Sequence, residues 1–189
     1  MAEPIQNETA RRIARVAKEL QDRKTDALRM FRPMEQQVPF FKSKAQERVL
    51  RGGNRSGKTM CACAEFASAV TGIPICDNFG NELPFNWPRN KPLNTWIIGY
   101  DQNHIGKTMY RYLFMPGSFQ IIRDKETNEW RAFNPIADAN RRDECRPAPP
   151  LIPPRLVDNS GWAWEDKANR VFSVCRLKNG TEIRAFSSK

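Results

Sequence analysis

Residues Gly52 to Thr59 are the part of the chain whose types and spacing could do chemistry. They read GGNRSGKT and satisfy the pattern Gly-x-x-x-x-Gly-Lys-Ser/Thr. Glycines let the backbone wrap closely around an anion with its N–H groups pointing inward. Lys58 can reach the β- and γ-phosphates of a nucleoside triphosphate, and the Thr59 hydroxyl can bind Mg²⁺. The loop therefore predicts a site for ATP and Mg²⁺.

Such a loop is positioned by a strand before it and a helix after it. Residues 47–51 (ERVLR) are apolar in the middle and fit a short buried strand. The stretch after Thr59, MCACAEFASAV, has small and apolar residues in a helical arrangement, and Gly72 is a natural helix stop. The helix would begin at the loop, so its positive end would also face the anion.

The rest of the chain supplies further strands and helices. The apolar stretch 93–100 (LNTWIIGY) follows an irregular loop over 72–92 and predicts a strand covered on both faces, as in a parallel sheet. We expect a helix over 103–114, a hairpin over 119–133 and an extended, proline-rich crossing segment over 134–160. VFSVCRL and TEIRAF flank Asn179-Gly180, which predicts a hairpin. The expected fold class is α/β: a P-loop NTPase domain with a mainly parallel sheet flanked by helices.

An amphipathic helix is predicted over residues 8–31, ending before Pro33. Its apolar side chains recur at three- and four-residue steps, interrupted only at Lys24: Ile13, Val16, Ala17, Leu20, Ala27, Leu28 and Phe31. The opposite face is basic and consists of Arg11, Arg12, Arg15, Lys18 and Arg23. This face either contacts DNA or a partner protein, or is simply solvated. The chain thus divides into an N-terminal helical appendage (1–33) and an ATPase domain (34–189).

The overall charge also bears on function. The net charge is +10, and residues 1–51 hold 12 basic against 7 acidic residues. A basic balance suits a polyanion such as DNA or RNA, although it is also common on ordinary soluble proteins. No apolar run approaches the length of a membrane span, and the N-terminus has no apolar signal-peptide segment. We therefore expect an intracellular protein that does not bind membranes.

Catalysis would need more than the loop. Arg55 lies inside it and could stabilise the γ-phosphate during transfer together with Lys58, or it could point to solvent or to a carboxylate. Hydrolysis also needs an acid that holds Mg²⁺ and a second acid that activates water. Asp101 ends the strand WIIGYD, but Gln102 stands where the second acid is expected. Whether this chain alone turns over ATP therefore stays open.

The block from Gln37 to Thr59, QVPFFKSKAQERVLRGGNRSGKT, resembles the large terminase subunit of tailed bacteriophages, the ATPase motor that pumps DNA into the procapsid. The shared pattern is a glutamine, an aromatic-x-x-Ser step, an arginine and a hydrophobic strand before the loop. Here these are Gln37, Phe40, Ser43, Arg48, Val49 and Leu50. Weaker similarity extends over roughly residues 35–187. One departure is Asn54, which stands where many terminases carry the loop arginine.

The resemblance implies a set of contacts and partners. Gln37 would contact the adenine, and ATP with Mg²⁺ would be held by Gly52, Gly53, Asn54, Arg55, Ser56, Gly57, Lys58 and Thr59. The implied partners are double-stranded DNA, a small terminase subunit, a portal protein and further copies of the chain in a ring. The implied location is the cytoplasm of the infected bacterial host. In this family the acidic pair lies on a later strand than Asp101 and a nuclease domain usually follows, so we expect this chain to be the N-terminal part of a larger protein.

Several alternatives remain open. The chain could be a small P-loop kinase, although such chains usually begin close to their P-loop strand, whereas 51 residues precede the loop here. It could also be a non-catalytic nucleotide-binding and assembly module that docks a partner through the 8–31 helix. An arginine given to a neighbouring subunit could be Arg111, Arg123 or Arg131. Four tryptophans beside basic residues (87, 130, 162 and 164) could stack on bases or cover core edges.

Overall fold

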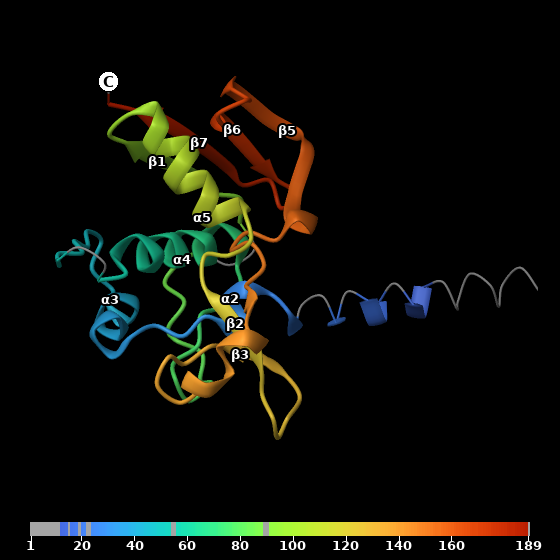
Figure 1. Cartoon of the computed structure of the whole chain (residues 1–189). Coiled ribbons are helices and arrows are strands. Elements are labelled where there is room, and N and C mark those ends of the chain that lie inside the picture. The colour runs from blue at the N-terminus through green and yellow to red at the C-terminus, as the bar shows by residue number, and fades with distance from the viewer. Residues whose placement is uncertain are drawn as a thin grey trace, which may run out of the picture.

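The computed structural model describes residues 12–14, 16–18, 20–21, 24–53, 56–88 and 91–188. Figure 1 shows one long helix, α4 (Lys58–Thr71), crossing the molecule between two sheets. The four-stranded sheet has the order β1 (Asn94–Gly99), β7 (Glu182–Ser187), β6 (Val171–Leu177), β5 (Val157–Asp166). The three-stranded sheet has the order β3 (Trp130–Ala132), β2 (Gln120–Arg123), β4 (Arg146–Pro147).

The sheets are mostly antiparallel, so the predicted mainly parallel P-loop sheet is wrong. Among the strands of the described residues, only β1 and β7 pair in parallel, whereas β7–β6, β6–β5, β2–β3 and β2–β4 are all antiparallel. The apolar run 93–100 suggested a strand covered on both faces. In the structure Ile97 is 7% exposed, whereas Trp96 and Ile98 are 67% and 66% exposed. β1 is therefore covered on one face only and lies at the edge of its sheet.

One further strand prediction is wrong, and one strand of the structure was not predicted. Residues 47–51 form no strand, and Val49 is 76% exposed, so this segment reaches the loop without sheet pairing among the described residues. β5 was not expected, because its pairing with β6 is interrupted by register shifts and its sequence does not alternate regularly. Both hairpins are confirmed: β2–β3 lies within residues 119–133, and β6–β7 turns at Asn179-Gly180.

The helix after the loop is confirmed and ends at Gly72, whose φ of 73° is the left-handed cap that glycine adopts readily. The predicted helix 103–114 is confirmed in extent, but its first part is a π-helix, η2 (His104–Tyr110), followed by α5 (Arg111–Phe114). The short helices are α2 (Ala27–Met30), η1 (Glu35–Gln37), α3 (Val38–Lys42), η3 (Ala139–Glu144) and η4 (Pro154–Leu156). None of the helices described is long and apolar enough to cross a membrane.

The single helix predicted over 8–31 is wrong for its described part, because the chain breaks between two helical pieces. The described residues between 12 and 24 are helical, Thr25 and Asp26 interrupt, and α2 follows. Asp26 is 3% exposed and accepts two bonds from the Arg155 guanidinium, at 2.5 and 2.7 Å, which fixes the break. Residues 1–11, and with them Arg11, lie outside the described part, as do Arg15 and Arg23.

The apolar stripe of the predicted helix has two fates. Its second half, in α2, packs into the core with Ala27 and Leu28 fully buried. Its first half does not, since Ile13, Val16 and Leu20 are 64%, 51% and 55% exposed on a segment that leads away from the body in Figure 1. The main core instead lies around α4, η2 and the inner face of the four-stranded sheet, where its largest buried side chains are Phe41, Phe172, Leu28, Ile105 and Leu113.

Candidate functional site

The loop reaches α4 through a left-handed glycine. Gly57 has φ 73° and ψ 13° and immediately precedes the first helical residue, Lys58. A Cβ atom at this position would lie 2.8 Å from Gln37 Nε2 and 2.9 Å from Met34 Cε. Both the backbone angle and the close neighbours therefore require glycine here. Asn54 and Arg55, two of the predicted ligands, lie outside the described residues.

Lys58 closes the loop on itself. Its Nζ donates to the carbonyl oxygens of Gly52 and Gly53, at 2.7 and 2.6 Å, and to Ser56 Oγ at 3.3 Å. The ammonium group is therefore held over the loop at the N-terminal end of a 14-residue helix. Because the helix end carries a partial positive charge, the lysine and the helix together make this small region favourable for an anion.

Gln37 contacts the loop itself. It is 8% exposed, its Oε1 accepts from the Met34 N–H at 3.1 Å, and its Nε2 lies 3.4 Å from the Gly57 carbonyl oxygen and 3.5 Å from that of Ser56. The amide thus joins the start of η1 to the end of the loop. The adenine contact implied by the resemblance is a separate role, and it stays a prediction.

A cleft of about 400 Å³ opens beside Lys58 and Thr59. One wall is α4, the other is β1 with the following η2, and most of the lining is apolar. The lining includes Leu50, Thr59, Phe66, Trp96, Ile98, His104 and Met109. Thr59 thus lies at the junction between the anion-favouring loop end and an apolar cleft, and this setting suits a ligand with a charged part and a flat apolar part.

The Asp101 side chain is bonded within the fold. Its Oδ1 accepts from the His104 N–H at 2.7 Å, so the carboxylate caps the start of η2. The Tyr100 N–H in turn donates to His104 Nδ1 at 3.4 Å. Gln102, which follows, donates to Glu165 Oε2 at 3.0 Å. Within the described part of the chain, no group of three or more His, Cys, Asp or Glu side chains could hold a metal ion.

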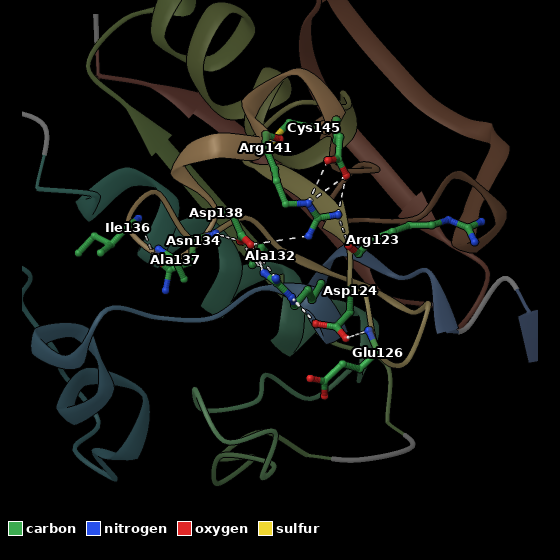
Figure 2. A network of polar contacts seen from close by, with 12 residues as sticks. Arg123, Asp124, Glu126, Ala132, Asn134, Ile136, Ala137, Asp138, Arg141 and Cys145 are labelled. Atoms are coloured by element: carbon green, nitrogen blue, oxygen red, sulfur yellow. Dashed lines mark hydrogen bonds and ion pairs between the residues drawn. The ribbon is translucent and has the colours of Figure 1, made fainter.

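Two of the arginines considered for a neighbouring subunit are engaged within the molecule. Figure 2 shows the polar network around β2, β3 and η3. The Arg131 guanidinium donates to Asp138 at 2.6 and 2.8 Å and to Asp124 at 2.9 Å. Arg123 donates to Asn128 Oδ1 at 2.8 Å and lies 5.0 Å from the Trp130 ring centroid. Arg111, in α5, is exposed.

Tryptophans 162 and 164 pack on other aromatic rings. Their own rings stack at 4.8 Å and 14°, and Trp162 meets Phe114 edge-on at 4.9 Å. Tyr110 and Phe172 complete the group, with centroid distances to Trp162 of 5.8 and 5.5 Å. This geometry supports the packing interpretation for these two residues. Arg89, the basic neighbour of Trp87, lies outside the described residues.

A cluster beside the loop combines two residues of the sequence block, Phe40 and Arg48, with two that the sequence did not single out for this role, Glu65 and Trp87. Glu65, in α4, accepts from Arg48 Nη2 at 2.7 Å and from Trp87 Nε1 at 3.1 Å. Arg48 Nη1 also donates to the Phe40 carbonyl oxygen at 3.0 Å. The guanidinium lies 4.7 Å from the Phe40 ring centroid and 5.6 Å from that of Trp87.

The ion pair in this cluster is poorly solvated. The Arg48 and Glu65 side chains are only 12% and 13% exposed. Burial, and then the nearby Glu65 carboxylate, raise the pKa of Cys61, one helical turn away, to about 12. The sequence offers one signal for Glu65, namely its spacing from Lys58. Seven residues are about two helical turns, so a helix after the loop places both side chains on one side of α4.

Comparisons of the chain with protein-family models, with curated proteins and with solved structures find no match.

Proposed function

We propose that residues 52–59 bind the triphosphate of ATP with Mg²⁺. The observation that carries the proposal is the position of Lys58 Nζ, held 2.7 and 2.6 Å from the Gly52 and Gly53 carbonyl oxygens at the start of α4. The Lys58 ammonium group and a helix N-terminus thereby lie at one place, the arrangement that phosphate groups favour.

The chain's own groups have distinct parts in this proposal. Lys58 would exchange the loop carbonyls for phosphate oxygens, because its ammonium group bonds more strongly to an ionised oxygen than to a neutral carbonyl oxygen. Thr59 would offer its hydroxyl to Mg²⁺, whose ligands are oxygen atoms. Gly57 allows the backbone to turn into the helix, and Gln37 holds that turn. The metal would supply charge neutralisation between the phosphates.

We further propose that ATP binding serves a viral DNA-packaging motor, as in the large terminase subunit. Two features support this: the sequence block from Gln37 to Thr59 and the net charge of +10. In this proposal the chain moves double-stranded DNA at the expense of ATP, with a small terminase subunit, a portal protein and further copies of itself as partners.

A second candidate is a nucleotide-binding module for assembly, without turnover. Two observations favour it. The Asp101 carboxylate, the acid that follows β1, is bonded to the start of η2. The exposed stripe of Ile13, Val16 and Leu20 is the kind of surface that docks another protein.

Titration with a fluorescent ATP analogue in the presence of Mg²⁺ tests the binding proposal. We expect Lys58→Ala to weaken binding about tenfold or more, because charge-assisted bonds to the phosphates are lost. Lys107→Ala is the matched control, since this exposed lysine lies in η2 and is not part of the loop. Wild-type protein without Mg²⁺-dependent binding, or equal binding by both variants, would contradict the proposal.

Phosphate release separates the candidate functions. Free phosphate released by the wild-type chain, faster with double-stranded DNA and lost in Lys58→Ala, would support the motor. Binding without release would support the assembly module. Transfer of phosphate to a nucleoside acceptor would instead indicate a kinase.

A further inference from the structure

The segment before the loop, residues 43–53, is not paired in a sheet. Residues 43–53 contain no helix or strand, and Val49 within them is 76% exposed. Gly52 and Gly53 nevertheless present their carbonyl oxygens to Lys58 at 2.7 and 2.6 Å. Besides these Lys58 bonds, a further side-chain contact joins the segment to α4.

Arg48 makes that contact, four residues before Gly52. Its guanidinium lies 4.7 Å from the Phe40 ring centroid and 5.6 Å from that of Trp87, and it is bonded to Glu65 on α4. The ion pair gains strength because little water reaches it, with Arg48 and Glu65 only 12% and 13% exposed. The arginine therefore joins α3, the segment before the loop and the helix after it.

Glu65 and Lys58 lie on the same rigid element. Two helical turns, about 10 Å, separate them along α4. A carboxylate at one end fixes the start of the loop through Arg48, and the ammonium at the other end closes the loop through Gly52 and Gly53. The helix thus sets the distance between Arg48 and the first two residues of the loop.

We propose that Glu65 is a positioning residue for the loop 52–59, acting through Arg48 with Trp87 as the second donor that orients its carboxylate. Glu65 does not contact the nucleotide in this proposal. The expected effect of Glu65 on ATP affinity rests on the proposed function, whereas its expected effect on the order of the loop does not.

The test compares Glu65→Gln with the wild-type chain by amide hydrogen exchange, fluorescent-ATP affinity and urea unfolding. The amide keeps the size of the side chain but removes the charge that holds Arg48. We expect the loop amides, that is, the Cys61 amide bonded to the Gly57 carbonyl oxygen at 2.9 Å and those of the next turn of α4, to exchange about tenfold faster, because the helix end at the loop opens locally. ATP affinity should fall by a similar factor.

Asp138→Asn is the matched control, because it removes a buried carboxylate from an arginine in the other sheet. It should lower the urea midpoint without a selective effect on loop amides. If Glu65 only stabilised the fold, Glu65→Gln would likewise lower the urea midpoint without a selective effect on loop amides. Trp87→Phe keeps a smaller aromatic ring beside Arg48 and keeps the ion pair, but removes the N–H donor, and should raise loop exchange about threefold. If Glu65→Gln does not fold, loop exchange in Trp87→Phe tests the proposal.

The outcomes distinguish this proposal from the proposed function. If loop exchange in both Glu65→Gln and Trp87→Phe equals that of the wild type, Glu65 does not position the loop. If exchange rises but the wild-type chain does not bind ATP, the positioning role holds and the nucleotide-binding proposal fails. If exchange rises but Glu65→Gln binds ATP as tightly as the wild type does, the positioning has no role in binding and the proposal is overturned in that part.

Discussion

Gly57 and Gly72 occupy the two ends of α4 with the same backbone angle, φ 73°, but in different surroundings. An alanine Cβ at Gly72 would meet no heavy atom within 4 Å. At Gly57 it would lie 2.8 Å from Gln37 Nε2 and 2.9 Å from Met34 Cε. The two positions therefore separate the cost of the left-handed backbone from the cost of disturbing the loop.

We predict that both Gly57→Ala and Gly72→Ala lower the free energy of unfolding by about 1 kcal/mol, from the backbone angle alone. Gly57→Ala should lose more, because Gln37 must move, and should also weaken ATP binding. Urea unfolding and the fluorescent-ATP titration measure the two effects. Equal stability and equal affinity in the two variants would mean that Gln37 does not hold the loop.

The site could be predicted from sequence where its residues are neighbours in the chain. The glycines, Lys58 and Thr59 all lie within residues 52–59, and the loop motif assigns each of them a role. Glu65 and Trp87 could not be assigned, because their roles depend on Arg48, which is 17 residues from Glu65 in the chain. Contacts between distant residues leave no periodic pattern for a sequence to reveal.

At the scale of elements, the β2–β3 hairpin is held to η3 by Asp138. This carboxylate accepts from Arg131 and from the Asn134 N–H at 2.9 Å, and its side chain is 5% exposed. Hydrogen bonding from Arg131 lowers the pKa of Asp138 from 3.8 to about 2. The carboxylate is therefore more acidic in the folded protein than in the unfolded chain.

A lowered pKa fixes the sign of the pH dependence. The stability that Asp138 contributes is fully present above about pH 4 and is lost as the pH falls through about 2. We predict that Asp138→Asn destabilises the protein by about 2 kcal/mol at neutral pH, because Arg131 loses its strongest partner. Urea unfolding at several pH values should show this difference narrowing towards pH 2. A difference that stays constant over this range would contradict the assignment.

Elements were predictable where local signals agree. The helix 58–71 has small residues inside and glycines at both ends, and both hairpins carry turn residues. The segment 47–51 has the composition of a strand, but a strand also needs a neighbour, which composition cannot supply. The break at Asp26 likewise depends on Arg155, 129 residues later. Local pattern thus predicted the elements better than their pairing.

At the scale of the whole molecule, β1 leaves an apolar surface uncovered at the edge of the sheet. Trp96, Ile98 and Tyr100 are 67%, 66% and 63% exposed, and Phe186 on β7 is 43% exposed and meets Trp96 at 5.6 Å. An edge strand with exposed apolar side chains pairs readily with other chains.

We predict that Ile98→Lys reduces concentration-dependent association of the purified chain, because a charge on an edge strand opposes pairing. Its stability should change by less than about 0.5 kcal/mol, as for other exposed positions. Ile97→Lys should instead unfold the protein, since Ile97 is 7% exposed. Sedimentation at several concentrations measures the first effect and thermal unfolding the second. Association that is unchanged in Ile98→Lys would rule out this surface.

The parallel pairing of β1 with β7 has a consequence for the order of folding. Contacts such as the Leu93 N–H to Thr181 Oγ1 join residues 88 positions apart. During synthesis α4 and β1 leave the ribosome long before the strand that covers one edge of β1. Closing so long a loop costs entropy before any bond is gained, so we expect the β6–β7 hairpin to form first and β1 to dock on it in a slow, late step.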